Sequence, residues 1–107
     1  MANQPKIVTL TASGTSESIA IDLASFRNGI GLICGVSTGA TVGYDVEVTG
    51  DRTDTPDSQK LWNPHDLLNG LTCAANGNLA YPVTAVRLNA QTVTGGTLQL
   101  AVVEVSG

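Results

Sequence analysis

The chain has 107 residues, of which 42% are hydrophobic and 13% are charged, with a net charge of −4 and a pI near 4.5. This length fits a single domain, and so low a charge content excludes a chain that is disordered by charge repulsion. The five basic residues are scattered along the chain, which argues against a nucleic-acid-binding surface. The longest nearly apolar run, 29–36, is too short to cross a bilayer.

The first half of the chain alternates apolar and polar residues over short segments, which is the pattern of half-buried β-strands. Strands are predicted over 6–10, 17–23 and 41–48. The inward side of the third segment consists of Val42, Tyr44, Val46 and Val48. Residues 29–38 are apolar with little alternation, which predicts a central strand that is covered on both faces.

A polar stretch, 49–60, interrupts the strands and is predicted to form an exposed loop. After this loop, Asn63 suits a helix N-cap, Pro64 suits the first helical position and Gly70 suits the exit. One short helical turn is therefore predicted near 63–69.

The last third of the chain predicts paired strands that are joined by tight turns. Asn-Gly at 76–77 and Gly-Gly at 95–96 are both signals for two-residue hairpins. The second turn fixes a register in which Arg87 faces Glu104, so that each strand places its only charge opposite the complementary charge. We therefore predict a structural, non-catalytic ion pair between Arg87 and Glu104, worth roughly 0.2–1 kcal/mol.

This register also makes the apolar residues change face along the hairpin. The two sets lie on opposite sides: Val93, Leu98 and Leu100 near the turn, and Val86, Leu88, Val103 and Val105 further away. A single flat sheet over one core does not require such a change. Two explanations remain open: the hairpin twists or bulges between two sheets, or one face is buried against a neighbouring chain.

Few residues are suited to catalysis or to metal binding. His65 is the only histidine, no nucleophile motif accompanies it, and we expect a solvated residue without a catalytic role. Asp51, Asp54 and Asp57 recur every three residues, a spacing that does not match a helix-loop-helix calcium loop. We therefore predict no catalytic residue, no bound metal and no cofactor.

The cysteines and the aromatic residues have structural interpretations. Cys34 and Cys73 are expected to be small buried residues in a reducing compartment, with a disulfide between them as the alternative. Trp62 ends the polar loop and is expected to pack centrally in the core. Trp62 and Tyr81 are also the candidate partner contacts, because protein interfaces favour aromatic side chains.

The segment YPVTAVRLNAQTVTGGTLQLAVVEV, residues 81–105, resembles the C-terminal pattern of small tailed-bacteriophage virion proteins. It contains an aromatic-Pro-Val start, a short strand with Arg-Leu, a Thr/Gly turn and a final apolar strand, and it covers about a quarter of the chain. The resemblance implies a non-enzymatic all-β domain, either a small antiparallel β-sandwich or a jelly-roll-like fold. It also implies synthesis in the bacterial cytoplasm and a final position on the capsid surface.

Within that group we expect a capsid decoration (cement) protein, formed by one β domain over 1–107. Its partners would be the assembled major capsid protein and copies of itself, with no nucleic acid and no membrane. Residues 1–5 would form an extended arm that is able to pair with a neighbouring sheet edge. The alternative is a tail or fibre component, or a receptor- or carbohydrate-binding module, that recognises its target through the loop 49–62.

Overall fold

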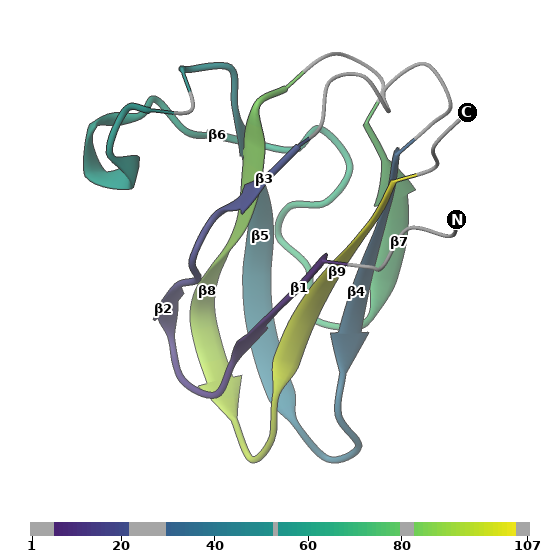
Figure 1. Ribbon diagram of the computed structural model, residues 1–107. Coiled ribbons are helices and arrows are strands. Elements are labelled where there is room, and N and C mark those ends of the chain that lie inside the picture. The colour runs from purple at the N-terminus through teal and green to yellow at the C-terminus, as the bar shows by residue number, and fades with distance from the viewer. Residues whose placement is uncertain (1–5, 22–29, 53, 80–82, 105–107) are drawn as a thin grey trace.

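The computed structural model describes residues 6–21, 30–52, 54–79 and 83–104, and it consists of two antiparallel sheets packed face to face (Figure 1). This arrangement confirms the predicted small antiparallel β-sandwich. Within the described ranges, the single helical element is the short 3₁₀ turn η2, Asp57–Gln59.

Sheet A has the strand order β1-β9-β4-β7, and neighbouring strands are antiparallel throughout. Its strands are β1 (Lys6–Leu10), β9 (Leu98–Glu104), β4 (Ile30–Val36) and β7 (Ala75–Asn78). The strands β1 and β7 therefore form the two edges of this sheet, and β9 and β4 form its centre.

Sheet B has the strand order β2-β8-β5-β6, and β3 also pairs with β8. Its strands are β2 (Gly14–Thr15), β3 (Ile19–Ala20), β8 (Ala85–Thr94), β5 (Thr41–Thr49) and β6 (Asn63–Pro64). Of the predicted strand 17–23, only the part covered by β3 is a strand, and residues 22–23 lie outside the described ranges.

The core lies between the two sheets and is filled by alternate residues of each strand. The predicted inward side of β5 is confirmed, because Val42, Tyr44, Val46 and Val48 are all buried. The largest fully buried aliphatic side chains from the other elements are Ile30, Leu32, Leu68, Leu88, Leu98 and Leu100. The expected central position of Trp62 is wrong. Among the described residues, Tyr44 is the aromatic residue of the core, and Trp62 is only half-buried outside it.

The strands β8 and β9 belong to different sheets, so the predicted hairpin at Gly95-Gly96 is wrong. The short turn carries the chain from sheet B to sheet A (Figure 1). Both strands contribute buried residues to the core between the sheets. Gly95 has a φ of +76°, which favours glycine, and a Cβ on Gly96 would lie 2.8 Å from the Cβ of Ala40. The face change in the sequence therefore reflects a connection between two sheets.

A β-bulge in β8 accounts for the rest of the face change. The register between β5 and β8 shifts between Gly43 and Tyr44, which leaves Gln91 without a partner on β5. One extra residue in a strand reverses the inward and outward positions that follow it. Leu88 before the bulge and Val93 after it are therefore both buried, although they are an odd number of residues apart.

The predicted helical turn near 63–69 is wrong. Residues 63–64 form β6 and pair with β5, and the backbone N–H of His65 donates to the carbonyl of Val46 at 2.7 Å. A helix of one or two turns has little intrinsic stability. Pairing with the edge of sheet B therefore overrides the local capping pattern of Asn63 and Pro64.

The predicted hairpin at Asn76-Gly77 is also wrong, because β7 runs straight through both residues and pairs with β4. Gly77 allows close packing of β7 against Leu68 and does not form a turn. A Cβ at this position would lie 2.9 Å from Cδ1 of the buried Leu68.

The expectation that the run 29–38 is covered on both faces is not met within this chain. The strand β4 does lie inside sheet A, between β9 and β7. Leu32 and Cys34 are buried on its inner side, but Ile33 on its outer side is 48% exposed.

Candidate functional site

Arg87 lies on the outer face of sheet B and makes its ion pair there. The register of β5 and β8 places it opposite Glu47, and its Nε donates to Oε1 of Glu47 at 2.8 Å. Asn89 donates to the other carboxylate oxygen at 3.1 Å. The predicted register, in which Arg87 faces Glu104, is wrong, because the backbone of Glu104 pairs with Ile30 in sheet A.

Trp62 covers Arg87 and fixes the polar loop, residues 50–62, against sheet B. The guanidinium Cζ lies 4.2 Å from the centroid of the indole ring, which is a cation–π contact. The indole Nε1 donates to the carbonyl of Asp57 at 3.1 Å. The loop extends away from the sandwich and returns to it at β6 (Figure 1). Trp62 directly precedes β6 and is half-buried.

The aspartates of the polar loop each have a separate partner. They accept hydrogen bonds as follows: Asp51 from the backbone of Leu61, Asp54 from Arg52 at 3.1 Å, and Asp57 from Lys60 at 2.9 Å. Within the part of the chain that the structure describes, no three His, Cys, Asp or Glu side chains are grouped as a metal site would require. These carboxylates therefore hold the loop together.

Asp57 also links the loop to the segment between β2 and β3, through a hydrogen bond with Ser18. The side chain of Lys60 is only 5% exposed, whereas that of Asp57 is 42% exposed. Hydrogen bonds from Lys60 and from Ser18 hold the pKa of Asp57 below its ordinary value. Lys60 and Asp57 therefore satisfy each other's charge within the loop.

His65 is buried, so the expectation of a solvated residue is wrong. Its Nδ1 accepts from the backbone N–H groups of Leu67 and Leu68, at 3.1 and 3.2 Å. Its Nε2 lies 2.8 Å from the carbonyl of Asn78 and therefore carries the proton that this contact needs. Because both ring nitrogens are bound to backbone groups, His65 joins the segment after β6 to β7.

The two cysteines are free, and they lie in different environments. Burial raises the pKa of the Cys34 thiol, and a hydrogen bond with Tyr44 partly opposes this effect. The Tyr44 hydroxyl donates to the carbonyl of Cys73 at 2.7 Å. The expectation of burial is therefore met by Cys34, whereas Cys73 is exposed and contributes its backbone to the same cluster.

Among the residues that the structure describes, none with a charged side chain lies across the centre of the outer face of sheet A. One cross-strand row consists of Ile7, Ala101, Ile33 and Asn76, and the row beside it consists of Thr9, Gln99 and Gly35. A third row holds Val103, Gly31 and Asn78. Ile7 and Ile33, at 51% and 48% exposed, stand on either side of the small residue Ala101. We call these three rows the sheet A face.

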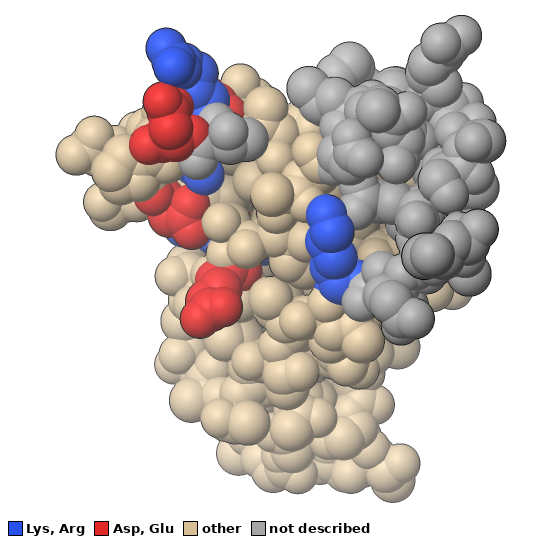
Figure 2. Space-filling view, viewed as in Figure 1, with Lys and Arg blue, Asp and Glu red and all other residues tan. Residues whose placement is uncertain are grey.

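On the face shown in Figure 2, the charged side chains of the described residues lie over the upper and middle parts, and the lower end carries none. This lower end contains the turns that join β4 to β5 and β8 to β9. The sequence has three long segments without charged residues, which supply this end and the sheet A face: 7–16, 30–44 and 88–103.

Sequence reasoning proposed Trp62 and Tyr81 as partner contacts. The first is engaged with Arg87 and Asp57, and Tyr81 lies outside the described residues. The sheet A face was missed, although the sequence carries two signals for it. One is the apolar run 29–36 without alternation, and the other is the set of long segments without charge.

Comparison of the chain with models of known protein families, with curated proteins and with solved structures finds no match. Among the described residues, no helix has the length and the apolar character needed to traverse a membrane.

Proposed function

We propose that this chain is a non-enzymatic structural protein of a bacteriophage particle that binds the assembled capsid lattice as a decoration protein. The observation that carries the proposal is the sheet A face, whose described residues are uncharged and partly apolar. The strand β4 has the continuous apolar sequence of a doubly covered strand, yet this chain covers only its inner side. A partner that covers Gly31, Ile33 and Gly35 would complete the environment that the sequence specifies.

The size of the surface fits a contact with a repeating lattice. Four strands about 4.8 Å apart and about 20 Å long give a face of roughly 400 Å². A standard stable interface takes about 800 Å² from each partner. The sheet A face alone is therefore half an interface, and the adjoining uncharged end with the turns 37–40 and 95–97 would supply the rest.

The mechanism is the addition of contact area, with no bond made or broken. A protein that binds only the assembled lattice stabilises it by mass action, in the same way as any ligand that binds one state of an equilibrium. The resemblance of 81–105 to phage virion proteins supports this assignment. Self-association would use the same uncharged surface, and light scattering of the isolated protein measures it directly.

The alternative function is recognition of a receptor or a carbohydrate by the loop 49–62, as in a tail or fibre component. A sugar-binding tryptophan offers an open ring face. Here Arg87 covers Trp62 at 4.2 Å, and Asp57 binds its indole N–H. These contacts favour a structural role for Trp62. A glycan array or a host-adsorption assay on which Trp62→Ala loses binding would favour the alternative.

The experiment is co-sedimentation of purified protein with capsids of the source particle that lack it. We expect the unaltered protein to sediment with the capsids and Ala101→Arg to remain in the supernatant, because the new charge lies between Ile7 and Ile33. Ser58→Arg adds the same charge to the exposed η2 turn and is expected to bind as the unaltered protein does. Equal binding by Ala101→Arg, or absence of the protein from purified particles, would overturn the proposal.

A further inference from the structure

The strand β1 leaves an open set of backbone groups at the edge of sheet A. Where β4 and β9 pair, the backbone N–H of Ser37 donates to the carbonyl of Thr97. In an antiparallel pair, every second residue from such a contact is hydrogen-bonded to the same neighbouring strand, and the residues between point to the other side. Gln99 and Ala101 therefore bond to β4, and Leu98, Leu100 and Val102 bond to β1. It follows from the pairing of β1 with β9 that the N–H and C=O groups of Ile7 and Thr9 point away from the sheet.

The other sheet edges are less suited to pairing with an added strand. The edge strands β2 and β6 of sheet B have two residues each, and β6 contains Pro64. The edge strand β7 contains Gly77, which weakens a strand. The strand β1 has five residues with the sequence KIVTL and no proline. Natural edge strands are usually shortened, charged or interrupted, and the centre of β1 has none of these protections.

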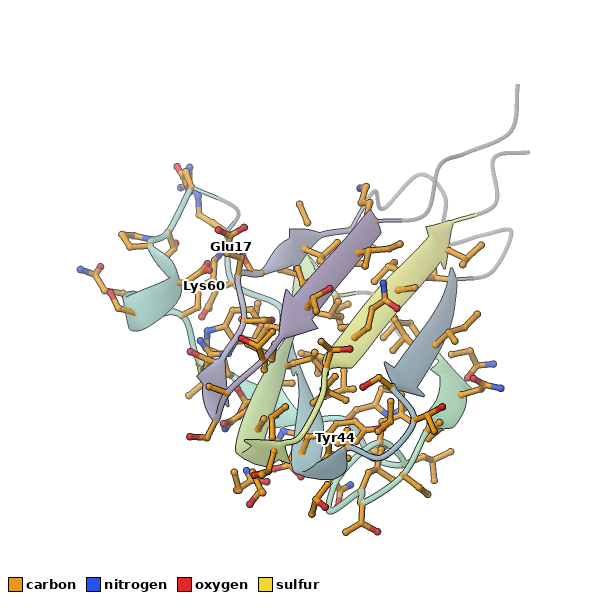
Figure 3. The ribbon with its side chains drawn as sticks, turned by 90° about the horizontal axis from the view of Figure 1, so that it is seen from below. Glu17, Tyr44 and Lys60 are labelled. Atoms are coloured by element: carbon orange, nitrogen blue, oxygen red, sulfur yellow. The ribbon has the colours of Figure 1, made fainter. Side chains whose placement is uncertain are left out.

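A groove runs along this open edge. Its volume is about 450 Å³, and it has two walls: Ile7, Val8, Thr9 and Leu10 on one side, and Thr15, Ser16 and Glu17 on the other. Glu17 is the only ionisable residue among them, and the structure shows no ion pair for its exposed carboxylate within the described residues. Figure 3 shows Glu17 on the side of the molecule where Lys60 lies and away from Tyr44.

We propose that this groove binds an extended peptide segment of another protein, which adds as a strand to β1 and places a Lys or Arg against Glu17. The backbone of the peptide would pair with the open groups of Ile7 and Thr9, the mode known as β-strand addition. The aliphatic and hydroxyl-bearing walls suit uncharged side chains on either side of the basic one. The proposal does not depend on the capsid assignment, because it uses the edge of sheet A rather than its face.

The charges and the two-walled shape identify the occupant. The whole chain carries a net charge of −4, and among the described residues of the groove lining the only charge is that of Glu17, so a basic segment is attracted and an acidic one is repelled. A groove bounded by both β1 and the segment 15–17 accommodates a single strand. A second copy of this chain that paired through its own β1 would also have to place its sheet B in this groove.

The experiment is a titration of the full-length protein, labelled with ¹⁵N, with three synthetic peptides. The first is acetyl-Ser-Val-Thr-Lys-Thr-Val-Ser-amide, the second has Glu in place of Lys, and the third is the Lys peptide with backbone N-methylation at alternate residues. We expect the Lys peptide to shift the amide signals of Ile7, Thr9 and Glu17 and to slow hydrogen exchange at Ile7 and Thr9. The Glu peptide is expected to bind more weakly than the Lys peptide, and the N-methylated peptide is expected to leave these signals unchanged.

Two pairs of variants separate the backbone contact from the charge contact. Thr9→Pro removes an outward N–H, a change that edge strands tolerate, and is expected to weaken binding at least tenfold, whereas Thr9→Val is expected to bind normally. Glu17→Gln is expected to weaken the Lys peptide about two- to fivefold at low salt, as for an exposed ion pair. Glu17→Lys is expected to reverse the preference in favour of the Glu peptide.

Three results would overturn the proposal. The first is the absence of binding by the Lys peptide, and the second is a set of shifted signals that excludes Ile7 and Thr9. The third is equal binding by the plain and N-methylated peptides. This comparison tests backbone pairing with β1 on the unaltered protein, so it holds even if Thr9→Pro does not fold.

Discussion

Arg87 on β8 lies directly opposite Glu47 on β5, and a 2.8 Å contact between Nε and Oε1 joins the two longest strands of the sandwich. Their side chains are only 17% and 14% exposed. Removal of either partner leaves the other charge partly buried without its complement, which costs more than the loss of a surface ion pair. The pair therefore stabilises the centre of sheet B.

A double-mutant cycle tests this relationship. We expect Arg87→Ala and Glu47→Ala each to lower the free energy of unfolding by about 1–3 kcal/mol, with a coupling of roughly 1 kcal/mol between them. Urea denaturation followed by circular dichroism measures both quantities. The matched control combines Arg87→Ala with Glu104→Ala, and the two effects are expected to add. Coupling to Glu104 in place of Glu47 would contradict the observed strand order.

The alternation of residue types predicted which side of each strand is buried, but not which strand lies beside it. Val42, Tyr44, Val46 and Val48 are buried as the pattern requires. A period of two residues specifies a face and carries no information about neighbours. The Gly95-Gly96 pair fits a hairpin within one sheet and a turn between two sheets equally well. The predicted register of Arg87 with Glu104 assumed the hairpin, whereas the structure has the turn between two sheets.

The candidate surface was harder to predict than the fold because it depends on tertiary pairing. The outward positions of sheet A come from strands far apart in the sequence, so that Ile7 and Ile33 share a row only through β9. The burial of His65 likewise depends on the carbonyl of Asn78 and on the position of the segment after β6. Local signals such as the Asn63-Pro64 cap compete with these contacts and lose.

Replacement of His65 by Leu is expected to lower the free energy of unfolding by about 2–4 kcal/mol. The substitution leaves two backbone N–H groups and one carbonyl without their partner in a buried site. Asp66→Ala, at the exposed neighbouring position, is expected to change stability by less than about 0.5 kcal/mol. Equal effects of the two substitutions in urea denaturation would show that the ring makes no such contacts.

The turn between β8 and β9 is expected to be intolerant of a side chain at Gly96. A Cβ at this position would overlap Ser37 and lie 2.8 Å from Cβ of Ala40, so we expect Gly96→Ala to lower the unfolding free energy by about 1–3 kcal/mol. Gly43→Ala is the matched control, because its Cβ would lie 4.0 Å from the Cβ of Thr92, an ordinary contact. Thermal denaturation compares them, and equal melting temperatures would contradict the close packing of the turn.

The two thiols are expected to differ in reactivity in the native protein. Cys73 is exposed, whereas burial both covers the Cys34 thiol and raises its pKa, which disfavours the reactive thiolate. A thiol-specific reagent such as Ellman's reagent should therefore modify one thiol per chain at pH 8 and two after unfolding in urea. Cys73→Ser should show no native reaction, and rapid native labelling of this variant would be inconsistent with the burial of Cys34.

Alkaline pH is expected to destabilise the fold through Tyr44. Burial, followed by the proximity of Cys34, raises the pKa of its hydroxyl well above the ordinary tyrosine range. An unfolded tyrosine loses its proton near about pH 10, while folded Tyr44 keeps it. The stabilising contribution of the neutral hydroxyl is therefore complete below about pH 10 and falls as the pH rises toward the folded pKa. Burial also raises the pKa of Cys34, so the ionisation of this thiol likewise lowers the stability of the fold, beginning at a lower pH than that of Tyr44.

The tyrosine is isolated by comparing Cys34→Ala with Cys34→Ala/Tyr44→Phe in urea denaturations between about pH 8 and pH 11. We expect the first variant to lose stability above about pH 10 and the second to lose less. At neutral pH, Tyr44→Phe should cost about 1 kcal/mol, because the hydrogen bond to the Cys73 carbonyl is lost. Parallel stability curves for the two variants at high pH would mean that Tyr44 ionises as readily in the folded chain as in the unfolded one.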